Sequence, residues 1–193
     1  MRTLVLFAHP APESLAAGLH QTVVQTLTAR GWEVDDCDLY AEGFQPVLSL
    51  EERRGYHDEA TNCAPVKTYV DRVRVAQALV LVFPVWNFGY PAILKGFFDR
   101  VFLPGVSFTI ENQVLKPNLH NITRLAAVTT YGGPRSRAFL VGDPPRKSVT
   151  RHLRALMHPQ CRVRYLALYG MNKMDQAGRE MFVSRVAREI GQL

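Results

Sequence analysis

The sequence contains few cysteines and no motif that would group them. Cys37, Cys63 and Cys161 are odd in number and far apart, and no two of them form a Cys-x-x-Cys pair. This argues against a disulfide framework and against a zinc site. The same pattern indicates a reducing compartment, so we expect a cytoplasmic protein without a bound metal.

Long hydrophobic runs are also missing. No stretch approaches the ~18 consecutive apolar residues of a membrane-spanning helix. Met1 and Arg2 lead straight into a short apolar segment, which does not resemble a signal peptide. We therefore expect no insertion into a membrane. The 193 residues show no repeat, low-complexity tract or linker, and we predict one domain spanning 1–193.

Acidic residues are nearly absent from one segment. Between residues 135 and 164, Asp143 is the only acid, and this segment carries a net charge of +7 against +6 for the whole chain. Its basic residues are Arg135, Arg137, Arg146, Lys147, Arg151, Arg154, Arg162 and Arg164. Such a segment either faces water or attracts an anionic partner. Nucleic acid is disfavoured as that partner, because the segment contains no known nucleic-acid-binding motif.

Short apolar segments of strand length alternate with amphipathic segments of helix length. The predicted strands are 2–8, 32–39, 78–83, 124–131 and 162–169. The predicted helices are 15–30, 66–76, 91–103, 148–157 and a last one that Asp175 caps. This alternation predicts an α/β fold, a doubly wound parallel sheet of five strands in the flavodoxin-like order 2-1-3-4-5. Residues 41–63 are predicted to be irregular around a short helix near 50–56, and residues 104–122 to contain a turn and an extended segment.

In this topology three loops meet at the carboxyl ends of the strands, beside the switch point between the first and third strands. They are His9–Ser14, Pro84–Tyr90 and Thr129–Gly133. The first loop begins a helix, whose free N–H groups suit a phosphate, and the side chains of His9 and Ser14 can bond to phosphate oxygens. Neither G-x-G-x-x-G nor G-x-x-x-x-G-K-[ST] occurs in the chain. Taken alone, this loop is better explained as an ordinary helix cap, since helix caps outnumber phosphate sites.

The other two loops change that balance. Trp86, Phe88 and Tyr90 are typical either of core packing or of contact with a flat ligand. Thr129 and Thr130 supply hydroxyl groups, and the two glycines that follow permit close approach of the backbone to the polar edge of a ring. Phosphate site, ring face and ring edge together predict a flavin mononucleotide.

The helix predicted at Pro91–Leu103 has apolar residues around nearly its whole circumference. A helix that is apolar on two sides needs two partners. We expect the sheet to be one partner and a second copy of the chain to be the other, which would form a two-fold homodimer. The alternative is cover from residues 41–63 or 104–122.

These segments also resemble a known family. FPVWNFGYPAILKGFFDRVF, residues 83–102, resembles the signature of the NAD(P)H:quinone oxidoreductases of flavodoxin-like fold. That family includes DT-diaphorase, bacterial quinone reductases and ancillary subunits of potassium efflux systems. His9-Pro10 with Ser14-Leu15 resembles its phosphate loop, and Thr129-Thr130 with Gly132-Gly133 resembles its flavin-edge loop. The three matches keep the family's order and cover the chain to about Gly133.

The resemblance implies a homodimer with one flavin in each subunit, FMN or alternatively FAD. NADPH or NADH would reduce this flavin, which would then pass two electrons as hydride to a quinone. We expect the flavin contacts to be His9, Ser14, Leu15, Ala16, Pro84, Val85, Trp86, Asn87, Phe88, Thr129, Thr130, Tyr131, Gly132 and Gly133. In this setting the basic segment has a candidate ligand in the phosphates of NADPH, through Arg135 and Arg137 above all; the plain alternative is a solvated surface.

The sequence departs from the family in places. Asn87 stands where an aromatic residue or glutamine is usual, and Phe97 where tryptophan is usual. The tyrosine and histidine pair thought to relay protons does not follow Gly133. Tyr131 is therefore the candidate catalytic donor, and its alternative role is to pack beside the flavin ring.

Other functions fit the same fold. Within enzymes, the chain could be an azo- or nitroreductase. Outside them, it could be a flavodoxin-like electron carrier, a regulatory subunit in peripheral contact with a potassium transporter, or a nucleotide-binding module without redox activity. The basic charge disfavours the electron carrier, whose known examples are acidic.

Overall fold

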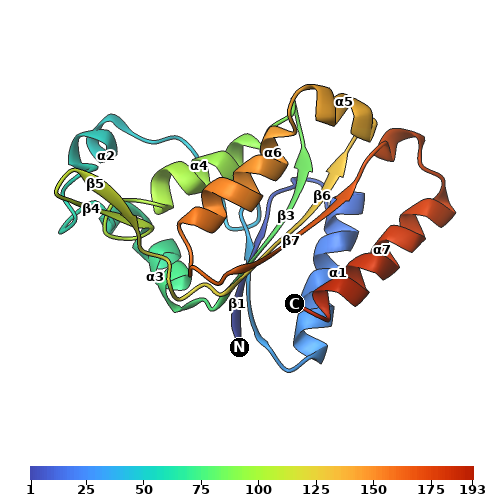
Figure 1. Ribbon diagram of the computed structural model, residues 1–193, viewed down its shortest axis with the longest axis horizontal. Coiled ribbons are helices and arrows are strands. Elements are labelled where there is room, and N and C mark those ends of the chain that lie inside the picture. The colour runs from blue at the N-terminus through green and yellow to red at the C-terminus, as the bar shows by residue number, and fades with distance from the viewer.

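A parallel sheet forms the centre of the molecule in the computed structural model, which describes residues 1–193 (Figure 1). Its strands are β1 (Arg2–Phe7), β2 (Glu33–Asp38), β3 (Ala78–Val85), β6 (Arg124–Tyr131) and β7 (Arg162–Leu168). They lie in the order β2-β1-β3-β6-β7, and every pair is parallel. In chain order this is 2-1-3-4-5, so the predicted fold class and strand order are confirmed.

Helices cover both faces of the sheet (Figure 1). On one face lie α1 (Leu15–Ala29) and α7 (Gln176–Ile190), whose first turn is capped by Asp175 as predicted. On the other face lie α3 (Lys67–Val75), α4 (Ala92–Val101), α6 (Pro144–Lys147) and the π-helical η2 (Ser148–Leu153), while α5 (Arg135–Leu140) lies beyond the carboxyl ends of the strands. The helix predicted from Ser148 thus begins earlier, because Asp143 and Pro144 start a helical turn that runs into it.

The burial of β3 on both faces of the sheet explains why its sequence is uniformly apolar. Leu79, Leu81 and Phe83 pack into the core under α4, while Val80 and Val82 pack into the core under α1 and α7. A strand buried on both faces has no polar side, and each such side chain contributes roughly 1.5–3 kcal/mol of burial free energy.

The strand also continues further than predicted. Pro84 and Val85 pair with Thr130 and Tyr131 of β6, so they belong to β3 and not to the loop. A proline is tolerated there because β1 ends at Phe7, opposite Val82, before Pro84 is reached.

Two segments stand apart from the sheet, at the far left of Figure 1. The first holds α2 (Leu50–Gly55), which Ser49 and Glu52 begin with a reciprocal capping box, and the 3-10 turn η1 (Ala64–Val66). The second is a hairpin of β4 (Phe108–Glu111) and β5 (Val114–Pro117), where only an extended segment was predicted. Its turn residues, Asn112 and Gln113, both adopt positive φ. The pair Asn-Gln is a weaker sequence signal for such a hairpin turn than Asn-Gly, so the hairpin was not predicted.

Helix α4 is covered on both sides within the chain. Pro46 lies directly against Gly96, the ring of Phe44 lies 5.5 Å from that of Phe97, and Arg100 bonds Glu52 at 2.5 Å. The segment 41–63 therefore supplies the cover that we expected from a second subunit. What remains exposed on α4 is a narrow strip that includes Ala92, Lys95 and Asp99. The largely apolar circumference of this helix is thus no evidence for a dimer.

The close contact at Gly96 makes a testable prediction. A Cβ at this position would lie 2.3 Å from the carbonyl oxygen of Pro46 and 2.5 Å from its Cα. We expect Gly96→Ala to lower the free energy of unfolding by about 1–3 kcal/mol, since backbone has to move. The same substitution at Gly18 in α1, where a Cβ meets nothing within 4 Å, should raise that free energy by about 0.4–1 kcal/mol. Urea denaturation measures both changes, and changes of the same sign would contradict this packing.

Candidate functional site

The second and third predicted loops line one cavity at the carboxyl edge of the sheet. Its volume is about 340 Å³, and its lining residues are Val85, Asn87, Phe88, Tyr131, Gly132, Gly133, Pro134, Arg137, Ala138 and Asn172. Here it is named the ring cavity. Six of these residues were predicted as flavin contacts from the sequence. The cavity lies where parallel α/β sheets bind ligands, beyond the ends of β3 and β6.

A tight turn after β3 presents aromatic rings to this region. The backbone N–H of Gly89 donates to the carbonyl of Trp86 at 2.8 Å, and that of Trp86 donates back to Gly89 at 3.3 Å. Between them Asn87 and Phe88 adopt φ values of +48° and +56°, a strained conformation for residues with side chains, and one typical of functional sites. The turn leaves Trp86 42% and Phe88 39% exposed. Phe88 lines the ring cavity, and Trp86 belongs to the same turn without being one of the lining residues.

Backbone donors are free around the same cavity. The N–H groups of Asn87, Phe88, Gly132 and Gly133 have no acceptor within the protein. Asn172, from the 3-10 turn η3 (Met171–Lys173), brings its side-chain amide within 3.0 Å of where a Cβ on Gly132 would stand. The cavity therefore combines apolar ring surfaces with several unused hydrogen-bond donors.

The first predicted loop lies next to this turn. The His9 ring is 5.6 Å from the Trp86 ring, and His9 Nδ1 accepts a hydrogen bond from Ala11 N–H at 3.0 Å. Ser14 caps α1 by accepting from Ala17 N–H at 3.1 Å. The N–H groups of Leu15 and Ala16 have no protein acceptor, so the start of α1 retains donors for an anion.

Eight predicted contacts are not among the residues that line the ring cavity: His9, Ser14, Leu15 and Ala16 of the first loop, and Pro84, Trp86, Thr129 and Thr130. Pro84 is inside β3, and Thr129 and Thr130 of β6 are only 1% and 3% exposed. The Thr129 hydroxyl is buried without a partner, while Gly132 and Gly133 reach the cavity instead. Strand β6 continues to Tyr131, two residues beyond Thr129. The hydroxyl groups of Thr129 and Thr130 therefore stay within the sheet, and Gly132 and Gly133 form the rim of the ring cavity.

Tyr131 belongs to a buried polar network. Its hydroxyl donates to Asp143 Oδ1 at 2.6 Å and lies 2.6 Å from the hydroxyl of Tyr165, while Tyr169 donates to Asp143 Oδ2 at 2.9 Å. Burial first, and then Tyr165 and the bond to Asp143, raise the pKa of Tyr131 far above its usual value. The ring of Tyr131 thus lines the cavity, whereas its hydroxyl is engaged within the wall.

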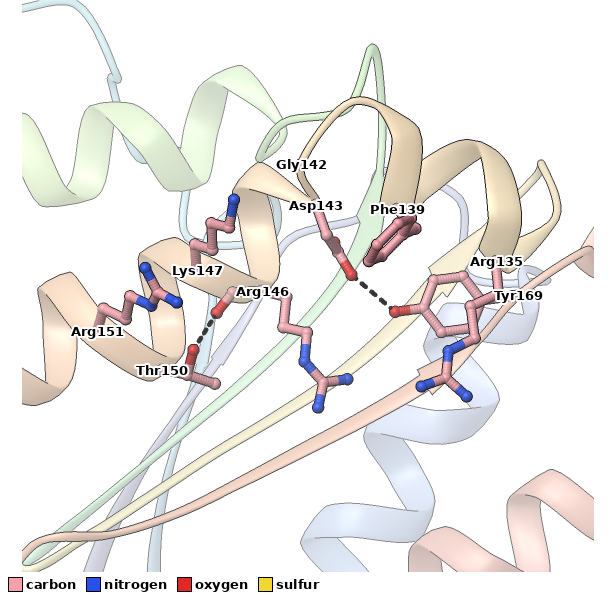
Figure 2. A pocket seen from close by; sticks show the side chains of 9 residues that line it. All are labelled: Arg135, Phe139, Gly142, Asp143, Arg146, Lys147, Thr150, Arg151 and Tyr169. Carbon is pink, nitrogen blue, oxygen red and sulfur yellow. Dashed lines mark hydrogen bonds between the residues drawn. The ribbon is translucent and has the colours of Figure 1, made fainter.

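A second cavity is lined by Asp143 and Tyr169 of the same network (Figure 2). Its volume is about 470 Å³, and it is lined by Arg135, Phe139, Gly142, Asp143, Arg146, Lys147, Thr150, Arg151 and Tyr169. It is named the basic pocket below. The two arginines predicted to bind the NADPH phosphates both lie in α5 but face different cavities: Arg135 lines the basic pocket and Arg137 lines the ring cavity.

Sequence reasoning missed several lining residues. Asn172 follows the fifth strand, whose carboxyl end was not considered as part of the site, although the strand order places that end at the same edge. Asp143 was counted only as the single acid of a basic segment. Its left-handed backbone, with φ +45°, turns its carboxylate toward the tyrosines, and no pattern in the sequence predicts that.

No helix of this structure is both long enough and apolar enough to cross a membrane.

Comparison with known proteins identifies the family. A family model described as flavodoxin-like fold matches residues 1–192. The chain is 31% identical over 147 residues, 68% of its length, to NAD(P)H dehydrogenase [quinone] 1 of Rattus norvegicus, and the match covers 54% of that protein. The chain thus spans about half the length of the curated relatives it matches.

Solved structures agree with this assignment. A protein from Streptococcus mutans superposes with a TM-score of 0.89 at 30% identity over 100% of both chains. An FMN-dependent NADH-azoreductase of Bacillus anthracis, solved with FMN, shares the fold with a TM-score of 0.76 at 14% identity, covering 99% of this chain and 96% of that one. On the match along its whole length, and on its sheet order, the chain belongs to the family with the flavodoxin-like fold.

Proposed function

We propose that the chain binds FMN in the ring cavity and acts as an NAD(P)H:quinone-type oxidoreductase. The observation that carries this proposal is the ring cavity itself, in which the exposed ring of Phe88 and free backbone N–H groups line one space. The turn that carries Phe88 also brings Trp86 to within 5.6 Å of the His9 ring in the first loop. The dimensions and mixed lining of the ring cavity are typical of cofactor sites. The similarity to a rat quinone dehydrogenase supports the same activity.

Each part of the site has a role toward the flavin. The free N–H groups of Leu15 and Ala16, with Ser14 and His9 beside them, would hold the phosphate at the positive end of α1. Trp86 and Phe88 would cover the ring, and Gly132 and Gly133 would donate to its polar edge, stabilising negative charge there. When bound, the flavin supplies hydride transfer from the reduced nicotinamide and two-electron transfer to the acceptor.

We infer that Tyr131 shapes the wall of the site. A direct role as proton donor is less favoured, because its hydroxyl already donates to Asp143 and its pKa is strongly raised. A group with so high a pKa is a poor acid at neutral pH.

Other acceptors and cofactors compete with this assignment. An azo dye or a nitro compound could take the same two electrons as a quinone, and FAD could replace FMN if its adenylate found room beyond the start of α1. We propose a cytoplasmic location on the three free cysteines, and co-purification with a membrane transporter would instead favour a regulatory subunit.

The flavin is tested directly. We expect the purified protein to be yellow, with one flavin per chain whose released mass is that of FMN. Gly132→Val should abolish most flavin binding, because its side chain would fill the cavity rim against Asn172. Gly55→Val, at the end of α2 and with nothing within 4 Å of its Cβ, is the matched control and should retain flavin. A colourless protein, or full flavin in Gly132→Val, would refute this placement.

The role of Tyr131 is tested by Tyr131→Phe. Phenylalanine keeps the ring but removes the donor to Asp143, so we expect flavin to remain bound and the free energy of unfolding to fall by about 1–3 kcal/mol. The kcat should change less than about tenfold, with the same pH dependence. A proton donor would contribute about 10²–10⁴-fold, and a loss of that size with a shifted pH profile would restore the catalytic role.

We also propose a homodimer, now through an apolar groove beside α4. This groove of about 530 Å³ includes Phe98, Phe102, Phe108, Leu115 and Leu156 in its lining. Light scattering should give twice the mass of the chain. Leu115→Glu, inside the groove, should yield monomers, whereas Ile110→Glu, on the same hairpin but outside the groove, should not. A monomeric wild type would refute the dimer.

A further inference from the structure

We infer that the basic pocket binds a phosphate group of the reducing pyridine nucleotide, on the side of the ring cavity away from the flavin phosphate. This inference rests on the proposed function, because it takes the ring cavity as the place where nicotinamide meets flavin. The shared chemistry is a phosphate dianion or diester, and its two possible sources are the 2′-phosphate of NADPH and the pyrophosphate common to NADPH and NADH.

The cations of the basic pocket have no counter-ions. Arg135, Arg146, Lys147 and Arg151 line it, and none of them takes part in an ion pair, although ten ion pairs engage charged side chains elsewhere in the chain. Against one carboxylate, that of Asp143, the lining carries a net charge of +3. All four cations therefore border one concave space.

The carboxylate of Asp143 forms no ion pair with these cations. Both oxygens of Asp143 are occupied by tyrosine hydroxyls, Oδ1 by Tyr131 and Oδ2 by Tyr169. Figure 2 shows the side chains of Arg146 and Arg135 extending on the same side of the pair formed by Asp143 and Tyr169. The guanidinium of Arg146 also lies over the ring of Tyr165 at 5.4 Å, which helps to orient it. The pocket is thus arranged for an anion from outside the chain.

The position of the basic pocket indicates that its phosphate belongs to the pyridine nucleotide and not to the flavin. Along the carboxyl edge of the sheet, the start of α1 follows β1, the ring cavity lies at β3 and β6, and Tyr169 of the basic pocket follows β7. With neighbouring strands about 4.8 Å apart, β1 and β7 are separated by roughly 14 Å. The flavin phosphate belongs at the α1 end of this row, so the anion at the β7 end is a different one.

The two cavities are close enough to share one extended ligand. Tyr131 contributes to the lining of the ring cavity, and its hydroxyl bonds Asp143, which lines the basic pocket. A single tyrosine therefore spans the wall between them. A dinucleotide with its nicotinamide in the ring cavity can pass over this wall and place a phosphate among the cations.

Binding of nucleotide fragments tests the inference without relying on turnover. Adenosine 2′,5′-bisphosphate, ADP and adenosine are titrated by calorimetry into the purified protein with its flavin. We expect at least one phosphorylated fragment to bind and adenosine to bind far more weakly. Arg135→Ala and Lys147→Ala should each lower the binding affinity for that fragment about tenfold or more, which is the effect expected when a charge-assisted hydrogen bond is lost. Arg135→Lys should retain most of the affinity, which excludes misfolding as the cause.

Arg162→Ala is the matched control, because Arg162 is exposed in the same basic segment but lies outside the pocket. It should change the affinity less than twofold. If the pocket variants bind only the bisphosphate more weakly and have a higher KM for NADPH alone, the pocket holds the 2′-phosphate. If they bind both phosphorylated fragments more weakly and have a higher KM for NADPH and for NADH, the pocket holds the pyrophosphate. Unchanged affinities in the pocket variants, or an equal loss in Arg162→Ala, would overturn the inference. A protein without flavin would instead refute the proposed function, and fragment binding to it would still report on the pocket.

Discussion

The parallel pairing of β1, β3 and β6 is the constraint on which the candidate site depends. Parallel strands that end together leave their last backbone groups and the loops after them at one edge. At this edge the chain leaves N–H groups without acceptors after all three strands, at Leu15 and Ala16, at Asn87 and Phe88, and at Gly132 and Gly133. The site is therefore built mainly from backbone, and side chains add its rings and its charges.

Charge is distributed unevenly along that edge. The start of α1 offers backbone dipoles and no basic side chain in its first turn, whereas the basic pocket, which Tyr169 after β7 helps to line, offers four cations from α5, α6 and η2. The first arrangement suits a cofactor that stays bound, since it involves few side chains that must be ordered. The second attracts a charged ligand over a longer range and weakens as ionic strength rises, which suits a substrate that arrives and leaves.

The features predicted from the sequence are those set by local pattern. The apolar run of β3 and the alternation of segments were sufficient for the fold and the strand order. The two glycines after Tyr131 were sufficient to locate one rim of the ring cavity. Long-range packing was not accessible in the same way, because the apolar residues around α4 look alike whether Pro46 or a second subunit covers them. The same limit applied to Asp143, whose partners Tyr131 and Tyr169 lie 12 and 26 positions away in the chain.

The turn from Trp86 to Gly89 has a consequence for the dynamics of the site. Two backbone hydrogen bonds close it, and its two central residues hold a left-handed conformation that costs roughly 1–2 kcal/mol for each. It is continuous with β3, whose residues up to Phe83 are almost completely buried. Some of the most and least stable backbone of the molecule thus meet within a few residues. We therefore expect local unfolding at this rim of the ring cavity to precede any opening of the sheet.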